Sequence, residues 1–204
     1  MSLFLSVLLI LTVFFGMVFL FLLSNYNLLI RLRNRVRTDF SDIEVQLRRR
    51  GSLVQTLVDM VREYAKHEND TFKGVAAARS ALERSTTPGE TAKADNMLTE
   101  TLRSLMMVTE AYPELRASEN FQQLRQDILR TEDQIATYRE TYNKTVERFN
   151  NVVQTFPSLL VANLFSFSSE ALFQQSSSEA YQLDADKKPT VVVAKKVAKK
   201  KTSK

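Results

Sequence analysis

The hydrophobic pattern of the chain begins with an uninterrupted apolar run. Residues 3–23 read LFLSVLLILTVFFGMVFLFLL and contain no charged side chain. As a helix rising about 1.5 Å per residue, this run is about 30 Å long, which matches the hydrocarbon core of a bilayer. The pattern therefore predicts one membrane-spanning helix that contacts lipid through residues 3–23, within an anchor of residues 1–25.

A cleaved signal peptide is the competing interpretation of this run. Signal peptides usually have a basic start, a shorter apolar core and small residues at the cleavage site. Here no Lys or Arg precedes the run, and Ser24, Asn25 and Tyr26 follow it. These features favour an uncleaved anchor.

Amphipathic helices follow the anchor. Apolar side chains recur every three or four residues in two series, Leu32, Val36, Phe40, Ile43 and Leu47, then Val54, Leu57, Val61 and Tyr64. Gly51 stands between the two series and predicts a kink or short break, with Ser52 as N-cap of a segment that continues toward Leu82. Residues 85–89 (STTPG) predict a loop.

The second half of the chain repeats the helical pattern. One helix is predicted from about Glu90 to the Tyr112-Pro113 step, and the longest one from an N-cap at Ser118 to Pro157. Long amphipathic helices joined by short loops pack best as antiparallel bundles, so residues 26–173 are expected to form one. The apolar segment 157–173 either caps this bundle or lies on the membrane.

The charge is unevenly distributed along the chain. The formal net charge is +5, but residues 187–204 hold eight lysines and no acidic residue, so residues 1–186 carry −3. Residues 174–204 are rich in Ser and Lys and predict a disordered basic tail. Its lysines are candidates for attracting anionic lipid or nucleic acid: Lys195, Lys196, Lys199, Lys200 and Lys201.

Arginines beside the span give the expected orientation. Arg31, Arg33, Arg35 and Arg37 all follow it closely. Basic residues favour the cytoplasmic side, so the N-terminus is predicted outside and the bundle in the cytoplasm, at the cell (inner) membrane. These arginines either only direct topology or also bind anionic headgroups.

Candidate catalytic and metal-binding chemistry is weak. The chain lacks cysteine, and Thr71 stands where an H-E-x-x-H motif starting at His67, the sole histidine, needs its second ligand. No nucleophile elbow or glycine-rich phosphate loop occurs. We therefore expect no catalytic residue, metal site or cofactor. Arg48, Arg49 and Arg50 are candidate partner contacts, although a solvated helix face explains them as well.

Polar residues follow two of the aromatic residues on the longest predicted helix. Tyr142 is followed by Asn143, and Phe149 by Asn150 and Asn151. Packing alone does not explain asparagines next to core aromatic residues. They predict a polar layer in the bundle or contact with a partner helix.

Several stretches resemble the LemA family of bacterial membrane proteins. They are YNLLIRLRNRVRTDFSDIEVQLRRR at residues 26–50, LVDMVREYAKHE at 57–68, VTEAYPELRASENFQQLRQDI at 108–128 and TEDQIATYRETYNKTVERFNNVVQTFP at 131–157. The resemblance covers nearly all of residues 1–173 and implies an N-terminal transmembrane helix followed by an antiparallel bundle. Ser166 stands where the family usually has glycine, so the resemblance leaves a tight turn there unsupported.

These observations predict an all-α, single-pass, membrane-anchored scaffold or protein-interaction module without enzymatic activity, bound to an unidentified protein. Two alternatives stay open. A non-catalytic regulatory subunit of a membrane enzyme would need polar side chains that converge at a pocket inside the bundle. A tether for nucleic acid or acidic lipid would act through the tail.

Overall fold

The computed structural model describes residues 1–66 and 68–173, and this part of the chain contains helices but no strand. Its helices are α1 (Ser2–Tyr64), α2 (Asn69–Arg84), α3 (Pro88–Thr109), α4 (Pro113–Ala117), α5 (Glu119–Gln154) and α6 (Ser158–Leu164). The prediction of an all-α fold is confirmed. The tail of residues 174–204 and the candidate histidine at position 67 lie outside the described residues.

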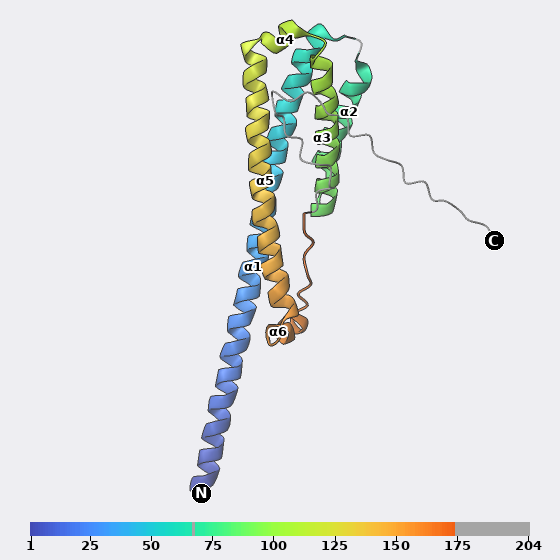
Figure 1. Cartoon of the computed structure of the whole chain (residues 1–204). Helices are drawn as coiled ribbons and strands as arrows, with labels where there is room; N and C mark the ends of the chain where they lie inside the picture. The colour runs from blue at the N-terminus through green and yellow to red at the C-terminus, as the bar shows by residue number, and fades with distance from the viewer. Residues whose placement is uncertain (67, 174–204) are drawn as a thin grey trace, which may run out of the picture.

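Helix α1 forms both the N-terminal extension and one wall of the bundle (Figure 1). Its 63 residues correspond to a length of about 95 Å. The most apolar window near its start has a mean hydropathy of 2.8 and is 0% buried, so α1 is long and apolar enough to cross a membrane. The core helix of a soluble protein would bury such a window, so the exposed window is a candidate membrane span.

The predicted break at Gly51 is wrong, because α1 continues through this residue and ends at Tyr64. A Cβ at Gly51 would meet Cγ of Arg79 at 3.9 Å and Cδ2 of Leu82 at 4.0 Å, which are ordinary contacts. One glycine costs a helix about 1 kcal/mol. Burial of neighbouring core side chains such as Val54 outweighs that cost.

The bundle has two regions of different thickness (Figure 1). Helices α1 and α5 run antiparallel along its whole length, and the α2–α3 hairpin packs beside them only in the half far from the N-terminus. The far half therefore combines α1 and α5 with the α2–α3 hairpin, and we name it the four-helix region, whereas the half near the anchor has only α1 and α5 as long helices, with the short α6 at its end. The antiparallel bundle predicted for this part of the chain is thus confirmed.

Two predicted helix starts are also confirmed. Thr87 and Glu90 form a capping box at the start of α3, directly after the expected loop. The Ser118 hydroxyl accepts a hydrogen bond from the backbone N–H of Phe121 at 3.2 Å and caps α5. Each cap satisfies a backbone donor that the first helical turn leaves unpaired.

A tight turn closes α6 and reverses the chain. Ser166 has φ of 55°, and the backbone N–H of Phe167 donates to the Ala162 carbonyl at 2.9 Å while that of Ser166 donates to Asn163 at 3.3 Å. These bonds are those of a Schellman motif, in which glycine is usual at the left-handed position. The turn therefore forms with serine in that place. Residues 165–173, which we name the C-terminal strap, then run back along α5 without helical structure (Figure 1).

Candidate functional site

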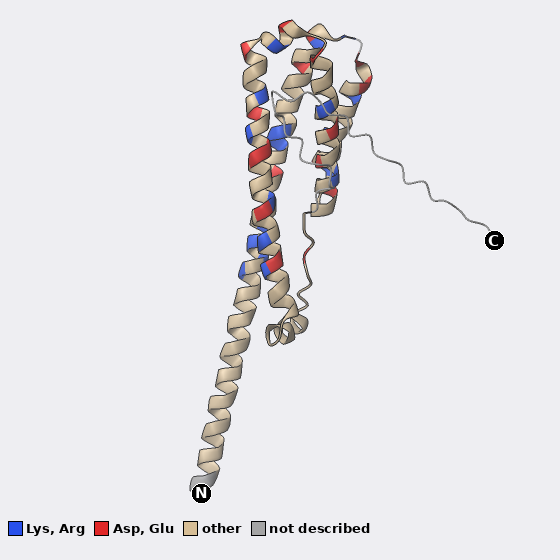
Figure 2. Cartoon of the chain, viewed as in Figure 1, with Lys and Arg blue, Asp and Glu red and all other residues tan. Residues whose placement is uncertain are grey.

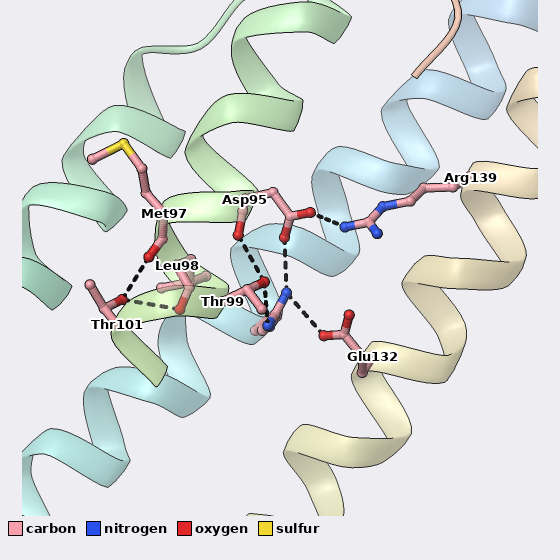
Figure 3. Close-up of polar contacts among 8 residues, drawn as sticks. Asp95, Met97, Leu98, Thr99, Thr101, Glu132 and Arg139 are labelled. Carbon is pink, nitrogen blue, oxygen red and sulfur yellow. Dashed lines mark hydrogen bonds and ion pairs between the residues drawn. The ribbon is translucent and has the colours of Figure 1, made fainter. Parts of the chain in front are cut away.

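Charged side chains from three helices meet inside the four-helix region (Figure 3). Nη1 of Arg50 in α1 lies 2.9 Å from Oδ1 of Asp95 in α3 and 2.9 Å from Oε2 of Glu132 in α5. Its Nη2 donates to the Thr99 hydroxyl at 3.0 Å. Arg139 of α5 donates to the other carboxylate oxygen of Asp95. We name Arg50, Asp95, Glu132 and Arg139 the arginine–carboxylate cluster.

The cluster balances two cations against two anions in a desolvated position. Arg50 and Asp95 are each only 1% exposed. Burial lowers the pKa of Arg50, although the Glu132 carboxylate opposes this fall. Burial, and next the positive charge of Arg50, lower the pKa of Arg139 to about 10. The Arg139 guanidinium therefore stays charged near neutral pH, and Asp95 is the carboxylate that Arg50 and Arg139 share.

This burial limits what the cluster can do chemically. A pocket of about 320 Å³ is lined by other residues, Glu44, Arg48, Leu82, Glu83, Ser85 and Thr91. Within residues 1–66 and 68–173, no group of three or more His, Asp or Glu side chains is placed to hold a metal ion. The cluster is thus polar, as the regulatory-subunit alternative requires, but its members do not line that pocket. Its geometry joins α1, α3 and α5.

The asparagines of α5 that packing did not explain bind the C-terminal strap. Asn150 donates through Nδ2 to the Glu170 carbonyl at 2.9 Å and accepts from the Glu170 N–H through Oδ1 at 2.8 Å. Asn143 pairs in the same way with Phe173, at 3.3 and 2.8 Å. The expected polar layer is therefore a contact with a non-helical segment, not with a partner helix.

Two aromatic side chains extend this contact into the core. The Tyr142 hydroxyl donates to the Ala171 carbonyl at 2.8 Å. Burial, and next the charge of Glu170, raise the pKa of Tyr142 to about 12. Arg139 of the arginine–carboxylate cluster lies over the Phe173 ring, 5.2 Å from its centroid. The strap thus covers one side of the cluster.

The arginines expected near the membrane differ in their surroundings. Arg31 and Arg37 are exposed. Arg33 lies over the Phe167 ring of the strap at 4.9 Å, and Nε of Arg35 lies 2.9 Å from Oδ1 of the buried Asp39. Arg33 therefore contacts another part of the bundle, whereas Arg35 is exposed and pairs within α1 itself. The five candidate lysines of the tail lie outside the described residues, so their roles stay predictions.

The second group of arginines does not act as a unit. Arg49 is exposed, and Arg48 is exposed beside Glu44 at 3.7 Å. Arg50 faces the interior instead, so it is not part of a surface that a partner could reach. The signal was present in the sequence, since Arg50 is three residues after Leu47 and four before Val54, both core positions.

Comparisons with known proteins agree with this architecture. The LemA family model matches residues 39–191, which begins after the anchor and extends past the strap. Magnetosome protein MamQ 1 of Paramagnetospirillum magneticum is 27% identical over 180 residues, which cover 76% of this chain and 66% of that protein. Protein LemA of Metamycoplasma hominis is 27% identical over 173 residues, which cover 83% of this chain and 78% of that protein. The chain thus spans slightly less than two thirds of the length of MamQ 1.

Proposed function

Because this chain belongs to the LemA family, we propose that it is a membrane-anchored helical scaffold that binds a protein partner through its bundle and catalyses no reaction itself. The observation that carries the proposal is the continuity of α1 from the apolar segment to the far end of the bundle. No loop interrupts it, so the bundle cannot fold back onto the bilayer independently of the span.

The length of α1 sets the reach of such a scaffold. From Tyr26 to Tyr64 the helix rises about 60 Å. The four-helix region therefore stands well beyond the lipid headgroups, which extend only about 5–8 Å from the hydrocarbon core. A partner bound there would be held at a fixed height above the membrane.

The far end offers apolar side chains for such a partner. Tyr64 at the end of α1 and Met107 near the end of α3 are exposed. The Tyr64 ring lies 6.4 Å from that of Tyr112, which keeps it in place. Aromatic residues and methionine are enriched at protein interfaces. We infer that the partner surface includes this end.

A photo-crosslinking residue at position 107 of the full chain, in native membranes, tests the proposal. The matched control is the same residue at Glu147, which is exposed on α5 in the two-helix region. We expect a discrete adduct from position 107 that position 147 does not give. Identical adducts from both positions, or none, would count against a partner surface at the far end.

The predicted orientation is part of the proposal and needs its own test. The basic residues after the span favour a cytoplasmic bundle. Because the chain lacks cysteine, Ser2→Cys and Glu110→Cys each introduce a single thiol for a membrane-impermeant maleimide. On spheroplasts, Ser2→Cys should be labelled directly and Glu110→Cys only after permeabilisation. The opposite pattern would reverse the assigned topology.

A further inference from the structure

An apolar surface surrounds α6, at the end of the bundle next to the anchor. From Phe149 to Ser169 the chain has no charged residue, and Figure 2 shows this end without blue or red ribbon. Four large side chains are exposed there: Phe156 at 78%, Leu160 at 60%, Leu164 at 67% and Phe165 at 50%. Together they expose on the order of several hundred Å², a size at which apolar patches mark interaction sites.

The helical period explains why the side chains of α6 face outward. Leu160 and Leu164 stand four residues apart in α6 and share one face of the helix, and Phe156 is exposed in the turn just before it. Val161 and Ala162 lie on the other side and are fully buried against the bundle. The inner face of α6 therefore fills the hydrophobic core. The apolar side chains of its outer face do not pack against the bundle.

Contacts with α1 place this surface at the depth of the membrane interface. The Tyr26 ring lies 4.7 Å from the Phe165 ring and 6.1 Å from the Phe167 ring. Tyr26 follows the last residue of the predicted span by three positions, which is about 5 Å along the helix. This distance lies within the headgroup layer, where aromatic side chains are enriched.

We infer that the outer face of α6, with Phe156, Leu160, Leu164 and Phe165, is a membrane-contact surface that inserts into the lipid interface beside the anchor. The occupant is the bilayer because the surface is continuous with a segment suited to lipid. Arg31, exposed about 7 Å further from the membrane than Tyr26, then faces the outer headgroup region. The inference rests on the anchoring in the proposed function, but not on its protein partner.

The absence of tryptophan from the chain allows a direct test with single-tryptophan variants. The full-length protein carrying Leu160→Trp is reconstituted into phosphatidylcholine vesicles whose upper acyl chains are brominated. We expect bromine to quench most of the emission of this variant and its maximum to lie at shorter wavelength than that of Met107→Trp. Met107→Trp, at the far end of the bundle, is the matched exposed control and should not be quenched.

A third variant separates failure of anchoring from failure of the inference. Val13→Trp lies in the predicted span, so its quenching reports anchoring alone. If Val13→Trp is quenched and Leu160→Trp is not, the inference is overturned while the anchor stands. In another outcome, the emission of Leu160→Trp is blue-shifted but not quenched by bromine, and it shifts back when the protein is diluted with more lipid. This would indicate that a second copy of the chain covers the surface, and it would also overturn the inference.

A charge substitution then tests whether the surface itself carries the insertion. Leu164→Glu should reduce the quenching of Leu160→Trp several-fold, because a carboxylate at this depth opposes insertion. Leu172→Glu is the control, since it makes the same change at an exposed position of the strap. Equal quenching in the two charge variants would contradict the inference. Circular dichroism confirms that both variants keep their helical content.

Discussion

Replacing Asp95 with asparagine should strongly destabilise the bundle. The substitution keeps the size of the side chain but removes the negative charge that Arg50 and Arg139 share. Arg50 keeps Glu132, whose side chain is 38% exposed, whereas Asp95 is the carboxylate that pairs with Arg139 within residues 1–66 and 68–173. The variant therefore leaves one guanidinium buried without a counter-charge.

The expected cost follows from this burial. Removing one partner of a buried ion pair costs about 3–5 kcal/mol, because the remaining charge stays desolvated. That is a large part of the 5–15 kcal/mol that typically holds a domain folded. For a chain of this size, each kcal/mol lowers the unfolding midpoint by about 2–4 °C, so we expect a fall of about 6–20 °C.

The assay is thermal unfolding of the full-length protein in detergent, followed by far-ultraviolet circular dichroism. Glu132→Gln is the matched control, since Arg50 then keeps Asp95 and Thr99, and we expect a loss of about 1 kcal/mol. Adding Arg139→Met to Asp95→Asn removes the unpaired cation and should recover part of the stability. Equal midpoints for Asp95→Asn and Glu132→Gln would refute the view that Asp95 is the desolvated, shared partner.

Three further predictions concern the strap and its turn. Ser166→Gly should raise the free energy of unfolding by about 1 kcal/mol in denaturant titrations, because glycine adopts φ of 55° without steric cost. Asn150→Asp should speed proteolysis of the strap. The Glu170 carbonyl now accepts a hydrogen bond from Nδ2 of Asn150, and in the variant it would face a carboxylate oxygen that has no proton to donate. The Tyr142 hydroxyl has a pKa of about 12 in the folded protein and about 10 in the unfolded chain. The folded state therefore has its full stability below pH 10, and its free energy of unfolding should fall by about 2–3 kcal/mol as the pH rises from 10 to about 12. Tyr142→Phe should flatten this part of the pH profile.

Hydrophobic spacing alone predicts most of the helices because burial repeats with the helical period. It fails where a charged residue occupies a core position. Arg139 lies four residues after Ile135 and three before Tyr142, and both neighbours are buried. The pattern marks the position as internal, but the charge suggests solvent. Its partner Asp95 is 44 residues away in the sequence, so nothing local identifies the pair.

The strap was missed for a different reason. Its residues lack helical period, and its hydrogen bonds go to side chains of α5 rather than to neighbouring backbone. The signal available in the sequence is the spacing of Asn143 and Asn150, seven residues apart on a core-facing helix. Amides at that interval suit an extended segment that lies alongside the helix, but the sequence does not show which segment pairs with them.

The continuity of α1 also gives the surface around α6 a mechanical consequence. Membrane helices tilt by about 20° on average, and over the 60 Å from Tyr26 to the far end such a tilt displaces the four-helix region sideways by about 20 Å. A single span fixes the height of the bundle but restrains its tilt weakly. Leu160 and Leu164 would add a second lipid contact beside the span. A tilt toward or away from α6 would then change how much apolar surface is buried in lipid, which is unfavourable. The two contacts together would present the far end of the scaffold at a defined height and direction.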